Sequence, residues 1–127
     1  MKLTLRDNLP FLTVTVSHKG LSIDVGDVLV DTGSASTVFS ADALDPLGIS
    51  PEPTDLLRGL RGIGGRELVY SRLIDRVAIG AHGVDGFAIE VAGMNYGFAI
   101  NGILGMNFLR RMNAVLDLGR LEIDFHA

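Results

Sequence analysis

The chain has 127 residues, which is the length of one domain, and we expect a single domain over residues 1–127. The absence of cysteine excludes a disulfide framework, a thiolate metal site and a cysteine nucleophile, and the three scattered histidines predict no metal site. The net charge of −4 argues against nucleic acid as a partner, and no apolar run approaches the roughly 18 residues of a membrane span.

Most of the expected elements are strands. Residues 11–16 alternate apolar and hydroxyl side chains, the period of a half-buried strand, and residues 21–24 would return antiparallel after a turn. The apolar run 27–30 predicts a strand buried on both faces. A short helix is expected from Ser40, a suitable N-cap, to Gly48, a suitable stop.

The second half of the chain continues this pattern. A long hairpin is predicted from Asp55 to Ile79, with its tip at Gly62-Ile63-Gly64-Gly65, because glycine permits the positive φ of tight turns. A short helix is expected at 106–111, after a second glycine-bearing loop. The remaining predicted strands are 69–79, 86–91, 114–118 and 121–125, the last two flanking a turn at Gly119-Arg120.

Two loops carry the motifs that concern chemistry. Asp31-Thr32-Gly33-Ser34 follows the buried strand, and read alone it is a turn in which an Asp side chain accepts bonds from backbone amides. Gly102-Ile103-Leu104-Gly105 precedes the second helix in the same way but contains no Asp. A nucleophile elbow, a P-loop and a dinucleotide-binding fingerprint are absent from the sequence.

Together these features resemble the single-domain, retropepsin-like aspartic peptidases of bacterial type. The resemblance covers about Phe11 to Phe125 and rests on three motifs in order: the apolar strand leading into D-T-G-S, the glycine-rich tip at 61–65, and G-I-L-G followed by Met-Asn-Phe-Leu. It implies an all-β fold, a closed barrel with a flap hairpin and two short helices. It also implies an aspartic endopeptidase that cleaves polypeptides without a cofactor or metal.

The resemblance assigns a role to each motif. Asp31 would be the catalytic carboxylate, Thr32 would brace two such loops across a subunit boundary, and Gly33 would allow the tight turn. The flap would bind substrate, and the second loop would also belong to the site. The flap residues are Gly62, Ile63, Gly64 and Gly65, and those of the second loop are Ile103, Leu104 and Gly105.

The number of catalytic carboxylates predicts the assembly. Peptide hydrolysis without a metal or a side-chain nucleophile can use two carboxylates that share a proton, one acting as base on water and the other as acid. Only Asp31 has the Thr-Gly sequel, so we expect the second carboxylate to come from Asp31 of another copy in a C2 homodimer.

Other residues carry finer expectations. A Ser34 hydroxyl that donates to the Asp31 carboxylate would favour its charged form, so Ser34→Ala should move the pH optimum upward. Apolar residues flanking the scissile bond are expected, while Tyr70 lies too far past the hairpin tip for a flap role. The expected cleft walls are Val30, Ile63, Ile100 and Ile103.

Alternatives remain open. A catalytically silent dimer of this fold would serve as a peptide-binding or assembly module, and a latent monomer would dimerise only at high concentration. The arginines of the hairpin arms would either attract acidic substrates or only solvate the hairpin. Met1 to Asp7 lack the apolar segment of a signal peptide, so we expect a cytoplasmic protein, or a periplasmic or membrane-tethered one if the natural chain begins earlier.

Overall fold

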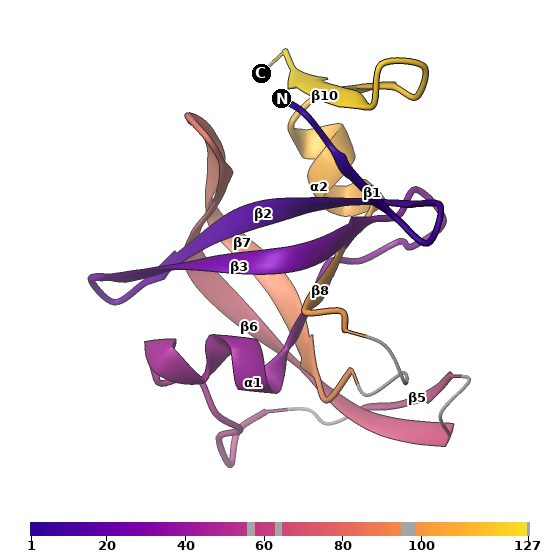
Figure 1. Cartoon of the computed structure of the whole chain (residues 1–127). Helices are drawn as coiled ribbons and strands as arrows, with labels where there is room; N and C mark the ends of the chain where they lie inside the picture. Colours follow the sequence, from indigo (N-terminus) through magenta and orange to yellow (C-terminus); the bar gives the residue numbers. More distant parts are fainter. Residues whose placement is uncertain (56–57, 63–64, 95–98, 127) are drawn as a thin grey trace.

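The computed structural model describes residues 1–55, 58–62, 65–94 and 99–126, with only the backbone described for 58–62 and 65–68 (Figure 1). Its elements, in chain order, are β1 (Thr4–Arg6), β2 (Leu9–His18), β3 (Leu21–Val30), β4 (Val38–Ser40), α1 (Ala41–Leu44), a 3-10 helix (Asp45–Leu47), β5 (Arg58–Gly62), β6 (Gly65–Ile79), β7 (His82–Ala92), β8 (Gly102–Leu104), α2 (Met106–Arg111), β9 (Ala114–Asp117) and β10 (Glu122–Phe125). The expected all-β fold with short helices is confirmed.

One large sheet contains the first eight strands. Its order is β1-β2-β3-β8-β4-β7-β6-β5, and β2 also pairs with β6, which brings the sheet round on itself as a barrel does. β9 and β10 form a separate antiparallel pair near the two chain ends (Figure 1). β3 and β8 run parallel, so their carboxyl ends meet at the same edge, where Asp31 follows β3 and Gly105 follows β8. The expectation of a loop over residues 102–105 is thus wrong for Gly102–Leu104, which form β8 itself.

The longest early strand, β3, differs from the expectation of two short strands. Its pairing with β2 shifts register between Leu12 and Val14, and Asp27 adopts a left-handed φ of 54°. A bulge of this kind bends a strand without ending it. β3 therefore continues to Val30 and delivers the chain directly to Asp31.

The expected helices are present, and one short strand was missed. Ser40 caps α1 by accepting a hydrogen bond from Ala43 N, and Gly48 ends the following 3-10 helix at a φ of 72°, as predicted. The strand β4 was not predicted, because three residues give no periodicity signal. The last turn was also wrong: Asp117 pairs with Glu122, so residues 118–121 connect β9 to β10.

The apolar core lies inside the curved sheet and holds the helix that follows the second motif. Phe39, Phe108 and Ile74 are fully buried, and the Phe108 ring meets Phe87 edge-on with centroids 5.5 Å apart. Phe108 belongs to α2, so the helix that follows the second motif loop is anchored in the core. None of the helices in the described residues is long and apolar enough to cross a membrane.

Candidate active site

The two motif loops lie side by side because their strands are paired. β3 and β8 are in parallel register, with Val28 opposite Gly102 and Val30 opposite Leu104. One step further on, Asp31 N donates a hydrogen bond to Leu104 O at 3.0 Å. Leu104, one of the residues expected in the second loop, is thus bonded directly to the Asp31 turn.

The Asp31 carboxylate is held by its own turn. Gly33 N donates to Asp31 Oδ1 at 2.9 Å, and Ser34 N donates to the Asp31 carbonyl at 3.2 Å. Asp31 is half-buried, whereas Thr32 and Gly33 are exposed. The turn therefore presents an oriented acidic side chain at the surface of the protomer.

Gly105 lets the second loop approach the first at backbone distance. A Cβ on Gly105 would lie 2.0 Å from Ser36 O and 2.9 Å from Ser34 O, closer than atoms can approach. Met106 N donates to Ser34 O at 2.7 Å across the same contact. Glycine at this position is thus a requirement of the packing between the loops.

Thr37 and Asn107 connect the two loops by side chains and were missed from the sequence. Gly105 N donates to Thr37 Oγ1 at 3.1 Å, and the Thr37 hydroxyl donates to Asn107 Oδ1 at 2.8 Å. The partners are 70 residues apart in the sequence. In the sequence, Asn107 stood out only as part of the Met-Asn-Phe-Leu stretch after Gly105, and no motif pointed to Thr37.

The Ser34 hydroxyl does not have the expected partner. It donates to Ser36 O at 2.8 Å, which uses its single proton within the loop, so it is not directed to the Asp31 carboxylate. The expectation that this hydroxyl tunes the Asp31 carboxylate is therefore wrong in this structure.

Ser34→Ala is accordingly expected to leave the pH–rate profile where it is and to reduce stability by about 1 kcal/mol, because one neutral hydrogen bond is lost. Peptide hydrolysis measured across pH would check the first point and urea unfolding the second. An upward move of the pH optimum would show that the hydroxyl turns to Asp31 in the working enzyme.

Comparisons with known proteins bear on this geometry. A family model described as "Aspartyl protease" matches residues 14–108, which include both loops. The chain belongs to the aspartyl protease family. A comparison with curated proteins finds no significant match.

Two solved aspartic proteases share the fold. A retropepsin-like aspartic protease from Rickettsia conorii superposes with a TM-score of 0.64 at 16% identity, covering 91% of this chain and 90% of the other. EIAV protease, solved in complex with the inhibitor HBY-793, gives a TM-score of 0.60 at 20% identity, covering 88% of this chain and 95% of the other. The retropepsin-like resemblance is confirmed at the level of family and fold.

The hairpin predicted between Asp55 and Ile79 is present in its two arms. β5 and β6 pair from Arg58↔Val69 to Gly62↔Gly65, and in Figure 1 this hairpin projects beyond the rest of the sheet. Ile63 and Gly64 lie outside the described residues. Of the hairpin arginines with described side chains, Arg72 and Arg76 both form ion pairs within the chain, which agrees with a structural role for these two.

The predicted cleft walls separate into two groups. Ile100 and Ile103 belong to a small apolar cluster that also contains Val69 and Leu29, and Ile103 and Leu29 are only half-buried. Val30 instead lies in the main core, because side chains alternate along β3 and Leu29 takes the cluster side. Ile63 lies outside the described residues.

Arg72 ties the base of β6 to the segment that leads into β5. Its guanidinium donates to Asp55 Oδ2 at 2.6 Å and to Ser50 O at 3.1 Å, and it lies 5.3 Å from the centre of the Tyr70 ring. Tyr70 is 4% exposed, and within the described structure its phenol oxygen is buried without a hydrogen-bond partner. Burial raises the pKa of the Tyr70 phenol, against the opposing effect of the Arg72 charge.

Tyr70→Phe is expected to stabilise the fold by about 1 kcal/mol at neutral pH, because it removes a buried polar atom that has no hydrogen-bond partner among the described residues. In the parent, the unfolded phenol ionises near pH 10.0 and the raised pKa of the folded phenol delays its ionisation to higher pH, so stability falls as pH rises through 10.0. Urea unfolding at about pH 7 and about pH 10.5 should show the variant's advantage growing with pH. A loss of stability at neutral pH would mean that the phenol has a partner.

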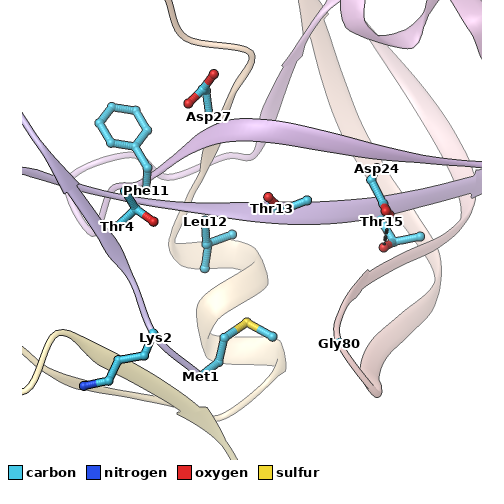
Figure 2. A pocket seen from close by; sticks show the side chains of 10 residues that line it. All are labelled: Met1, Lys2, Thr4, Phe11, Leu12, Thr13, Thr15, Asp24, Asp27 and Gly80. Carbon is cyan, nitrogen blue, oxygen red and sulfur yellow. Dashed lines mark hydrogen bonds between the residues drawn. The ribbon is translucent and has the colours of Figure 1, made fainter.

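One surface hollow is remote from the Asp31 loop, and another lies beside it. Figure 2 shows a hollow of about 390 Å³ where Thr13, Thr15 and Asp24 lie along β2 and β3, with Thr15 Oγ1 donating to Asp24 Oδ1 at 2.7 Å. None of the predicted site residues lines it. The second, of about 300 Å³, lies beside the Asp31 loop and is lined by Thr32, Met106, Leu109, Arg110, Asn113, Ala114 and Leu116.

Among the described residues, Asp31 is the one carboxylate assigned to the site. The hydrogen bonds and ion pairs of the described residues bring no other acidic side chain to Asp31. The same residues contain no group of three side chains able to hold a metal ion.

Proposed function

We propose that the chain is an aspartic endopeptidase in which water is activated between the Asp31 carboxylates of two copies in a symmetric homodimer. The observation that carries the proposal is the Asp31 turn of an aspartyl protease family member, with its carboxylate fixed by Gly33 N at the exposed end of β3. Asp31 is the proposed catalytic residue, and Thr32, Gly33 and Ser34 shape its loop.

The homodimer follows from the chemistry of the pair. A single carboxylate cannot act as base on water and as acid on the carbonyl at once, whereas two at short range share one proton and divide these tasks. A C2 axis beside Asp31 supplies the second from the same loop. The half-buried apolar residues beside Thr32, among them Met106 and Leu116, give the second copy a surface to cover.

The reaction uses the two carboxylates in turn. The ionised one takes a proton from water, whose oxygen attacks the peptide carbonyl carbon, while the protonated one gives its proton to the carbonyl oxygen. The tetrahedral intermediate then collapses: the protonated Asp31 gives its proton to the amide nitrogen, a hydroxyl of the intermediate returns a proton to the ionised Asp31, and the C–N bond breaks. The amine leaves, and the pair again holds one proton. All protons in this sequence come from water or the two Asp31 side chains.

The substrate class is an extended polypeptide with apolar residues at the cut. The β5–β6 hairpin projects from the sheet, as a flap that closes over a strand-like peptide would. The half-buried side chains of Leu29 and Ile103 offer apolar surface beside the motif loops. In this assignment Gly62, Ile63, Gly64 and Gly65 are the flap residues, with Ile63 and Gly64 at its tip.

The proposal is tested by hydrolysis of a peptide library from about pH 3 to about pH 7, with Asp31→Ala in parallel and sedimentation at the assay concentration. We expect cleavage by the wild type and none by the variant. A wild-type dimer that cleaves nothing would favour a peptide-binding or assembly module. A wild-type protein that stays monomeric would redirect the question to what drives dimerisation.

A further inference from the structure

We propose that Thr37 and Asn107 form a positioning pair, which fixes the Asp31 loop on α2 and thereby sets the direction of the Asp31 carboxylate. This inference rests on the proposed function, because it takes Asp31 as the catalytic residue. Neither Thr37 nor Asn107 touches the reacting atoms in this account, and both act through the backbone of the motif loops.

The Asp31 loop is attached to its neighbour at three points. Asp31 N bonds Leu104 O at 3.0 Å, Ser34 O accepts from Met106 N at 2.7 Å, and Thr37 Oγ1 accepts from Gly105 N at 3.1 Å. The first two are backbone bonds, so only the third depends on a particular side chain.

The Thr37 hydroxyl accepts one hydrogen bond and donates another, and its partners fix which is which. It has a single proton, which it donates to Asn107 Oδ1 at 2.8 Å, while its lone pair accepts Gly105 N–H. Asn107 Oδ1 also accepts from Phe108 N at 2.8 Å, so both bonds specify the amide oxygen at this position. Thr37 is 0% exposed, so water does not replace a lost partner without rearrangement.

Movement of Gly105 would be transmitted to the carboxylate. Gly105 packs against Ser36 and Ser34 with no room for a side chain, so a displacement of one loop displaces the other. Ser34 and Gly33 in turn donate their amide protons to the Asp31 carbonyl and carboxylate. A misplacement of about 1 Å in such a chain is enough to lower a catalytic rate about 100-fold.

The kinetic test compares Thr37→Val, which keeps the shape and removes the hydroxyl, with Thr37→Ser, which keeps the hydroxyl. We expect Thr37→Val to lower kcat about 10- to 100-fold with little change in KM, and Thr37→Ser to restore most of it. Asn107→Leu should resemble Thr37→Val, and the double variant should be no worse than either. The matched control is Thr15→Val, which deletes an equally short hydroxyl bond to Asp24 remote from the loops.

A second readout does not need turnover. Hydrogen exchange of the Gly33 and Ser34 amides reports directly on bonds to Asp31, and Thr37→Val should speed it at least about tenfold while Thr15→Val does not. Unchanged exchange and unchanged kcat in Thr37→Val would overturn the positioning role and leave the peptidase proposal intact. A dimeric wild type without activity would overturn the peptidase proposal, and the exchange measurement would still decide whether the pair orients Asp31.

Discussion

A dimer that carries Asp31→Asn in only one of its two subunits is expected to lose about 10²- to 10⁴-fold in kcat. The reason is that one carboxylate remains to act either as base or as acid, but no longer shares a proton with a second. Differently tagged wild-type and variant chains, expressed together and purified through both tags, give this species. Its kcat is then compared with that of the doubly tagged wild-type dimer.

The same design has a stringent control. When equal amounts of the untagged wild type and Asp31→Asn variant are mixed and allowed to exchange subunits, about one quarter of the random dimers are wild type in both subunits. If the two Asp31 residues act as a pair, the activity of the mixture should be that fraction of the activity of wild type at the same total protein concentration. A fall to one half would mean that each protomer works with its own Asp31 alone, and the shared site would be abandoned.

Gly105→Ala is expected to destabilise the fold by about 3 kcal/mol or more, and to prevent folding if the parent is only marginally stable. The added Cβ would lie 2.0 Å from Ser36 O and 2.6 Å from the Ser36 carbonyl carbon. Both are backbone atoms, which cannot rotate aside as a flexible side chain would. Urea unfolding followed by circular dichroism measures the loss.

Gly119→Ala is the matched control for this substitution. Its Cβ would meet Asp117 Oδ1 at 3.5 Å, an ordinary contact, so the change should stay within about 0.5 kcal/mol. Comparable losses at the two positions would mean that the close approach of the motif loops is not what requires glycine at Gly105.

The elements of this fold were predictable where local chemistry specifies them. The alternation of apolar and polar residues indicated β2. A capping serine at 40 and a stop glycine at 48 indicated the helical segment between them, and the glycines at 62 and 65 indicated the end of a hairpin. The order of strands was not predictable from periodicity. The parallel pairing of β3 with β8 joins segments whose sequences contain no sign of one another, and it was not predicted.

The site divides in the same way. Asp31 and Gly33 could be found because a short motif contains the carboxylate and the amide that orients it. Thr37 and Asn107 could not, because a threonine before an apolar strand and an asparagine in a short helix are ordinary until tertiary structure brings them together. The Ser34 error has a related cause, since the sequence shows that a hydroxyl is present but not which acceptor it reaches.

The parallel pairing of β3 with β8 also has a consequence for the order of folding. The Asp31 turn is supported by Leu104, Gly105 and Asn107, which a ribosome synthesises some 70 residues later. Until that segment emerges, the D-T-G-S stretch lacks its bonds to Leu104 and Met106, and only its own turn and the pairing of β2 with β3 support it. We therefore expect the nascent chain to remain without peptidase activity until its final third has joined the sheet, with slow closure typical of non-local β pairing.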